Sequence, residues 1–237
     1  MLVAAFGVLK APRQVNWKEL VPTMERSGAD AVPITLLINL LVGLVMALQS
    51  SAQLKRFGAE IFVADLVGIS MARELGPLMT AIIATGRSGA SFAAELGSMK
   101  INEEIDALRT MGFGPMRFLV IPRTLALMLV LPLLTLLADL VGMLGGLVIG
   151  VVSLGLTPMG YWNETQKAVR FWDVGSGMIK ACAFALAIAL ISCQQGLAAS
   201  GGAEGVGRRT TSAVVTTLFT LILIDTVFTL FFQAGQL

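Results

Sequence analysis

The run TLALMLVLPLLTLLADLVGMLGGLVIGVVSLGL fills residues 124–156 and contains a single charged side chain, Asp139. A membrane-spanning helix needs about 20 mostly apolar residues. The run is therefore too long for one upright span and short for two. We expect one long helix that overhangs one face of the membrane, with a helical hairpin as the alternative.

The composition of the whole chain agrees with a membrane location. Hydrophobic residues make up 56% of the 237 residues, charged residues make up only 14%, and the mean hydropathy is +0.82. A soluble domain carries about 25% charged residues, because its surface needs polar cover. We therefore predict an all-α membrane protein in which residues 1–237 form a single transmembrane domain.

Four further apolar runs predict the remaining spans, which gives about five transmembrane helices: residues 32–49, 61–99, 176–197 and 210–232. Residues 1–31 are no secretory signal peptide, because they lack the order of charged start, apolar middle and small-residue cleavage site. Within them, residues 15–31 mix apolar and charged side chains at helical spacing. This pattern predicts a helix lying on the membrane surface, with a short soluble lead-in as the alternative.

The distribution of lysine and arginine predicts the orientation, since cytoplasmic segments carry the excess of both. With the N-terminus inside, ten of these residues fall in inside segments and four in outside segments. The inside residues are Lys10, Arg13, Lys18, Arg26, Lys100, Arg109, Arg117, Arg123, Arg208 and Arg209, and the outside residues are Lys55, Arg56, Lys167 and Arg170. The C-terminus is then outside.

Two adjacent ionisable residues early in the second span, Arg73 and Glu74, are the first candidates for function. A charge in the bilayer core is costly unless it is paired or wetted. Adjacent residues point roughly 100° apart on a helix, so the two do not form a simple same-face pair. The guanidinium of Arg73 matches phosphate oxygens and suits an anionic head group. A structural ion pair with a neighbouring helix is the alternative.

Four other charges inside apolar sequence are interpreted as structural. Arg87 and Glu95 flank a turn rich in glycine, serine and alanine, and we expect partners for them near the cytoplasmic end. Asp139 and Asp225 are expected to pair with Lys180 or Arg87.

Small residues recur every four positions in two of the apolar runs, which predicts close helix packing within the subunit or across a dimer. The rows are Ala81, Thr85, Gly89, Ala93 and Gly97; Gly86, Ala90, Ala94 and Ser98; and Gly142, Gly146 and Gly150.

The sequence gives no support for catalysis or for a bound cofactor. The chain has no histidine, the commonest proton shuttle and metal ligand, and we predict no metal site. Cys182 and Cys193 lie eleven residues apart on one expected helix and cannot bridge. No phosphate loop of the G-x-x-x-x-G-K-[ST] type is present, so ATP has no such site here. The net charge of +2 implies no nucleic-acid partner.

The most charged segment lies within residues 100–116 and contains NEEIDALRTM, residues 102–111. Ile105, Leu108 and Met111 fall on one face at helical spacing. Acidic side chains in the first turn favour the helix dipole, and Gly112 is suited to end the helix. Short helices with an apolar stripe dock into grooves on partner proteins. A solvated connector is the alternative.

One long segment resembles a known family. Residues 73–113, RELGPLMTAIIATGRSGASFAAELGSMKINEEIDALRTMGF, closely resemble the MlaE/YrbE family of permeases, the membrane subunits of ABC systems that work with MCE-domain proteins. The segment GGAEGVGRRTTSAVV is similar to the last cytoplasmic loop of that family and the start of its final helix. The resemblance covers roughly residues 15–235.

The resemblance implies a homodimeric ABC permease of the bacterial inner membrane, driven by a separate ATPase subunit that holds ATP and magnesium. The implied role is phospholipid traffic between inner and outer membranes, which maintains outer-membrane lipid asymmetry. The implied partners are the ATPase, an MCE-domain protein and a small STAS-domain protein.

The resemblance also assigns residues to two sites. A lipid at the dimer interface would contact Leu54, Phe57, Arg73 and Glu74. The helix within residues 100–116 would be the coupling helix that docks on the ATPase through Glu103, Glu104, Ile105, Leu108, Arg109 and Met111.

Two rival functions remain at this point. A secondary transporter would use Glu74, Asp139 and Asp225 as ion or proton sites without an ATPase. A membrane scaffold without a substrate would leave unexplained why Arg73 and Glu74 are kept inside a span.

Overall fold

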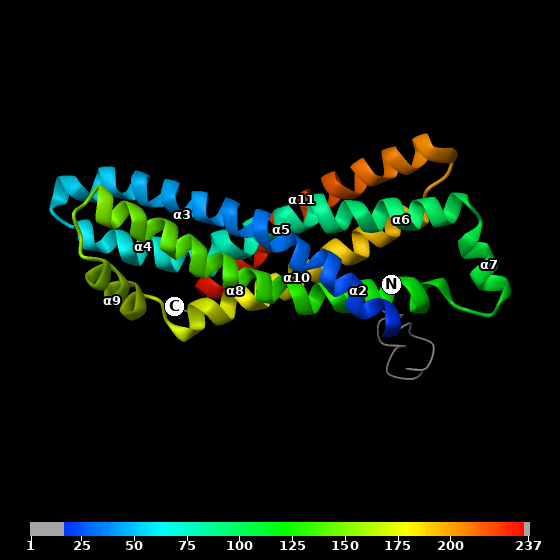
Figure 1. The fold of residues 1–237 in the computed structure, drawn as a ribbon, viewed down its shortest axis with the longest axis horizontal. Coiled ribbons are helices and arrows are strands. Elements are labelled where there is room, and N and C mark those ends of the chain that lie inside the picture. The colour runs from blue at the N-terminus through cyan, green and yellow to red at the C-terminus, as the bar shows by residue number, and fades with distance from the viewer. Residues whose placement is uncertain (1–16, 235–237) are drawn as a thin grey trace. The chain divides into compact units, whose positions relative to one another are not determined.

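The computed structural model describes residues 17–234, and these are helical between short turns, with no β-strand among them (Figure 1). Five helical stretches of this part are long and apolar enough to cross a membrane: Trp17–Phe57, Glu60–Ile101, Met116–Val152, Phe171–Leu197 and Gly202–Ala234. The predicted all-α fold with five spans is confirmed. Helices suit lipid because each satisfies its backbone hydrogen bonds internally.

The first stretch begins with the amphipathic helix α2, Trp17–Ser27, followed by a 3₁₀ turn and the long helix α3, Val32–Leu54. Trp17 and Val21 on α2 are 50% and 67% exposed. The helix predicted within residues 15–31 is therefore present over its described residues. Its position at the membrane surface stays a prediction, and residues 1–16 lie outside the described part.

The second stretch is one helical path that opens with a 3₁₀ turn, Glu60–Phe62, and contains three α-helices: α4, Val63–Ser70, α5, Gly76–Ala84, and α6, Ala90–Ile101. A π turn, Met71–Leu75, joins α4 to α5, and a second π turn, Thr85–Gly89, joins α5 to α6. The first π turn contains Arg73 and Glu74, and the second contains Arg87. The turn expected between Arg87 and Glu95 is wrong, because the path stays helical through its small residues. Such π turns occur frequently at functional sites.

The third apolar run forms a single helix. A short helix α7, Glu104–Thr110, precedes a π turn Met116–Val120, and α8 then runs from Ile121 to Val152. The hairpin alternative is wrong, because α8 continues through Pro132 without a turn.

The last part contains α9, Pro158–Ala168, α10, Phe171–Leu197, and α11, Gly202–Ala234. Thr157 caps α9 by accepting a hydrogen bond from the backbone N–H of Gly160 at 3.1 Å. Such a cap satisfies a backbone donor that the first turn of a helix leaves open.

The described residues form two compact units. Unit 1 comprises those before Val32 together with Ala81–Leu131 and Cys182–Thr226. Unit 2 comprises Val32–Thr80, Pro132–Ala181 and those from Val227 onward.

Unit 2 is held together by close backbone approach and one tyrosine ring. Gly43 of α3 lies directly against the backbone of Gly142 of α8, and no side chain fits between them. A Cβ added at Gly150 would lie 2.7 Å from the ring of Tyr161, which is 1% exposed. The glycine row of α8 therefore packs helices together, as predicted.

Unit 1 uses the first small-residue row in the same way. A Cβ at Gly89 would lie 2.9 Å from Ser192 Oγ of α10, and one at Gly97 would lie 3.2 Å from Val206 of α11. In the second row Gly86 is exposed and has open space around it, so the chain leaves this position uncovered.

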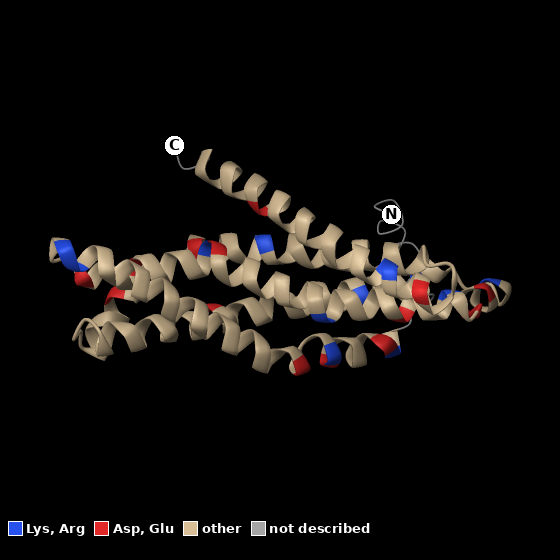
Figure 2. Ribbon diagram, turned by 90° about the horizontal axis from the view of Figure 1, so that it is seen from above, with Lys and Arg blue, Asp and Glu red and all other residues tan. Residues whose placement is uncertain are grey.

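Charged residues are sparse along most of the long helices and dense around α7, at the right-hand end of Figure 2. This distribution is typical of helices that traverse lipid and loops that meet water.

Candidate functional site

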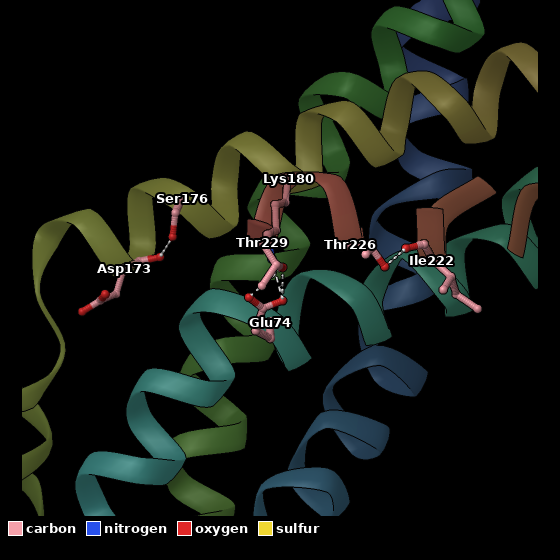
Figure 3. Close-up of polar contacts among 7 residues, drawn as sticks. All are labelled: Glu74, Asp173, Ser176, Lys180, Ile222, Thr226 and Thr229. Atoms are coloured by element: carbon pink, nitrogen blue, oxygen red, sulfur yellow. Dashed lines mark hydrogen bonds and ion pairs between the residues drawn. The ribbon is translucent and has the colours of Figure 1, made fainter. Parts of the chain in front are cut away.

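The centre of the candidate site is an ion pair between residues of two predicted spans, and both residues belong to unit 2. Lys180 of α10 donates to Glu74 Oε2 at 2.5 Å and to Thr229 Oγ1 of α11 at 2.8 Å. The Thr229 hydroxyl lies 3.1 Å and 3.3 Å from the two Glu74 oxygens. Figure 3 shows the Lys180 and Thr229 side chains pointing toward Glu74. Three separate segments of the chain therefore meet at one carboxylate.

Burial makes this pair costly to break. The Lys180 side chain is 1% exposed and that of Glu74 is 37% exposed. Desolvating an ammonium ion is expensive unless a partner of opposite charge and further hydrogen bonds compensate. The carboxylate keeps an accessible edge, so the site has a buried cation and a partly open anion.

A second ion pair joins the adjacent residue to the start of α10. Arg73 Nε binds Asp173 Oδ1, and Asp173 Oδ2 accepts the backbone N–H of Arg170 at 2.7 Å. The Ser176 hydroxyl donates to the Asp173 carbonyl oxygen at 2.8 Å, as seen in Figure 3. Arg73 therefore forms a structural ion pair with a neighbouring helix, which was the alternative to binding a lipid head group. Its side chain is still 32% exposed, which leaves donor groups for another anion.

A small cavity of about 40 Å³ lies at these two pairs. Its lining is Arg73, Glu74, Trp172, Ser176, Lys180, Thr229, Phe232 and Gln233. The rings of Trp172 and Phe232 meet edge to face at 5.9 Å. One water molecule needs about 10–15 Å³ of such a cavity, so the cavity admits a small polar group and no whole lipid.

An apolar groove of about 340 Å³ lies beside the same π turn. It is lined by Ile38, Leu41, Val42, Val45, Met46 and Leu75. Glu74 lines the polar cavity and its neighbour Leu75 lines the groove. The π turn Met71–Leu75 therefore presents a charged site and an apolar wall on adjacent residues.

The four residues predicted to bind lipid do not all meet. Arg73 and Glu74 share the polar cavity. Leu54 packs against the buried cluster that includes Val63, and Phe57 is 81% exposed in a 3₁₀ turn. Neither Leu54 nor Phe57 lines the cavity or the groove.

Sequence reasoning missed the partners Lys180, Asp173 and Thr229. Lys180 lies 106 residues from Glu74, and no pattern in a single sequence pairs them. A signal existed, because a lysine within an apolar run marks a functional candidate by itself.

The other intramembrane charges have mixed outcomes. Arg87 pairs with Asp30 at 3.3 Å, and Glu95 pairs with Arg123 at 2.9 Å. Asp139, which is 5% exposed, forms no ion pair with a described residue, so its expected pairing with Lys180 or Arg87 is wrong. The pairing of Asp225 stays a prediction.

The predicted coupling helix exists as α7, and Gly112 ends it with φ +83°. The N–H of Phe113 bonds to the Leu108 carbonyl at 3.0 Å, a pairing typical of glycine-terminated helices. Ile105 is fully buried within unit 1, whereas Met111 is 62% exposed. The apolar stripe therefore divides: Ile105 anchors the helix, and the polar edge and Met111 face outward. Exposed residues of this edge include Glu103, Glu104 and Arg109.

The chain is similar to known proteins over almost its whole length. The family model described as Permease MlaE matches residues 20–231. A probable ABC transporter permease protein of Rickettsia prowazekii is 39% identical over 98% of this chain and 89% of its own length. A probable ABC transporter permease protein of Synechocystis is 37% identical over 89% of this chain and 80% of its own.

A third relative has a more specific name. The intermembrane phospholipid transport system permease protein MlaE of Haemophilus influenzae is 34% identical over 97% of this chain and 90% of its own length. The Rickettsia and Synechocystis relatives are named as probable ABC transporter permeases, which argues against a secondary transporter and for a permease subunit without a catalytic role. The protein is a multi-pass membrane protein, and it belongs to the MlaE family of ABC transporter permeases.

Proposed function

We propose that this permease moves phospholipids between the inner and outer membranes of a bacterium, using ATP hydrolysed by a separate subunit. The observation that carries the proposal is the π turn Met71–Leu75, which places a charged cavity beside an apolar groove. A phospholipid has the same two parts, a charged head and apolar tails. The name of the Haemophilus relative supports this substrate class.

The chemistry of the two lining sets supports a division of labour. Arg73 has exposed donors for a phosphate group, since guanidinium binds phosphate with parallel hydrogen bonds. The groove has almost purely apolar walls and leaves room for part of an acyl chain. The cavity is too small for the lipid body, so the tails would lie in the groove and only a polar group would reach the Glu74 pair. Leu54 and Phe57 remain candidates for contact with the lipid outside the cavity.

A homodimer would complete the lipid pathway. The groove on α3 and Leu75 is open on one side, and a second copy of the chain would close it. The MCE-domain protein is proposed as the partner that hands lipid to or from the outward end, and the STAS-domain protein as a further cytoplasmic partner.

ATP binding and hydrolysis are assigned to the partner ATPase, which would hold ATP and magnesium. We infer that α7 docks on it through Met111, Leu108 and Arg109 together with its acidic edge. Burial of Ile105 supports this role, because a helix anchored in its own subunit transmits force without detaching.

The proposed orientation has the N-terminus in the cytoplasm and the C-terminus in the periplasm. The excess of lysine and arginine in the inside segments supports it. This orientation also places α7 on the same side as the ATPase.

The test is phospholipid transfer from proteoliposomes that contain the chain with its co-purified partners. We expect transfer of a fluorescent phospholipid to require ATP and to stop when ATP is depleted with ion gradients intact. Transfer that survives ATP depletion and collapses with the gradient would instead support a secondary transporter.

A further inference from the structure

Unit 1 contains a second polar cavity, far larger than the first. Its volume is about 490 Å³, within the range of small-ligand sites. It lies between α2 and the path formed by the second π turn and α6. Its lining includes Ser88 and five charged residues: Glu19, Arg26, Asp30, Arg87 and Glu95. No role assigned above uses this cavity.

Three of the charges in the lining, those of Asp30, Arg87 and Glu95, already have partners. Arg87 binds Asp30 at 3.3 Å and donates to the Arg26 carbonyl oxygen at 2.5 Å, which ties the end of α2 to the π turn. Glu95 is bound at 2.9 Å by Arg123, which is 5% exposed. These contacts join α2 and the second helical path at the walls of the cavity.

One cation and one anion remain available in the cavity. Arg26 reaches Glu95 only at 3.5 Å and its side chain is 70% exposed. The Glu19 carboxylate makes no ion pair with a described residue. The buried Ser88 hydroxyl also has no hydrogen-bond partner among the described residues. The cavity therefore offers a guanidinium and a carboxylate.

The two remaining charges have opposite signs and line one cavity, which suits a zwitterion. Glu19 and Arg26 lie seven residues apart on α2, on the same face and about 10 Å apart along the axis. A phosphate and an ammonium joined by a two-carbon bridge can lie between these two side chains, because both line the same cavity. The exposed Trp17 and Val21 on the same helix are suited to the lipid–water boundary, where such head groups lie.

We propose that this cavity binds the head group of a membrane phospholipid that joins a phosphate to a primary ammonium, as in phosphatidylethanolamine. Arg26 holds the phosphate, and Glu19 accepts from the ammonium. The site is separate from the Glu74 cavity and needs only a membrane beside α2, so it does not depend on the proposed transport. In the proposed orientation it takes lipid from the cytoplasmic leaflet.

To test this, the purified full chain in mild detergent is titrated with phosphatidylethanolamine or with phosphatidylglycerol of matched acyl chains. Bound lipid is then counted by native mass spectrometry. Glu19→Gln should weaken phosphatidylethanolamine binding about tenfold and leave phosphatidylglycerol unchanged, whereas Arg26→Gln should weaken both about tenfold. Arg208→Gln, an exposed arginine of unit 1, is the matched control and should change neither.

Equal binding of the two lipids by the native chain, or native-like binding by both site variants, would overturn the proposal. A water-soluble glycerophosphoethanolamine should not displace the lipid at equal concentration; if it does, the site takes free phosphoesters and the lipid assignment is wrong. In a chain that carries Glu74→Gln and Lys180→Met, the Glu19 and Arg26 substitutions should weaken lipid binding by the same factors. Loss of transport in that double variant would therefore leave this proposal standing.

Discussion

Breaking the Glu74–Lys180 pair on one side should cost much more than removing both charges. In Glu74→Gln the buried Lys180 ammonium loses the Glu74 carboxylate and keeps its hydrogen bond to Thr229. Removing one partner of a buried pair costs about 3–5 kcal/mol. Because the Glu74 side chain is 37% exposed, water compensates in part, and we expect about 3 kcal/mol.

The double variant Glu74→Gln/Lys180→Met removes both charges and should recover most of this loss. The free energy of unfolding is measured by titrating SDS into the detergent-solubilised protein while following tryptophan fluorescence. The four-variant cycle cancels other contacts of each residue and should give a coupling energy of about 2–3 kcal/mol. Additive costs, with coupling below about 0.5 kcal/mol, would refute the ion pair as a stabilising contact.

Three further predictions address packing, coupling and alkaline stability. Gly43→Ala should lower the free energy of unfolding by about 2 kcal/mol, because the added Cβ would meet the backbone of Gly142. Gly142→Ala should cost less, because its Cβ would meet the flexible end of the Met71 side chain. Equal losses of the two variants in SDS titrations would contradict this contact. Ile105→Ala should lower the free energy of unfolding by about 2–5 kcal/mol. Arg109→Ala should leave stability unchanged and lower the amount of lipid transferred per ATP hydrolysed. Normal coupling of transfer to hydrolysis in Arg109→Ala would rule out docking through this residue. Burial, reinforced by the nearby Asp65 carboxylate, raises the pKa of Tyr161 above its ordinary 10.0. The native chain should therefore lose stability as the pH rises beyond about 10, where the unfolded chain releases this proton and the folded chain keeps it. Tyr161→Phe should lack that part of the loss.

The features that follow from local pattern were predictable. The five apolar runs determine the spans, since each satisfies the length that lipid demands. Gly112 ends α7 because a positive φ is required there. The glycine row of α8 packs against its neighbours because only small residues allow backbones to approach so closely.

The partners of the charged residues were not predictable, because they depend on tertiary packing. Lys180 and Thr229 meet Glu74 only once three distant segments pack together. The helical periodicity of α7 placed Ile105 on a docking face, but periodicity does not say which part of an apolar stripe the subunit itself covers. The π turns were missed as well, since their widened hydrogen-bond pattern has no simple sequence signal.

ATP-driven phospholipid transport by this permease is tested most directly by purifying the tagged chain from its native membrane in mild detergent and identifying bound proteins and lipids by mass spectrometry. We expect recovery of an ATPase with a phosphate loop, an MCE-domain protein and stoichiometric phospholipid. Recovery of the chain alone, with neither an ATPase nor enriched phospholipid, would contradict this function.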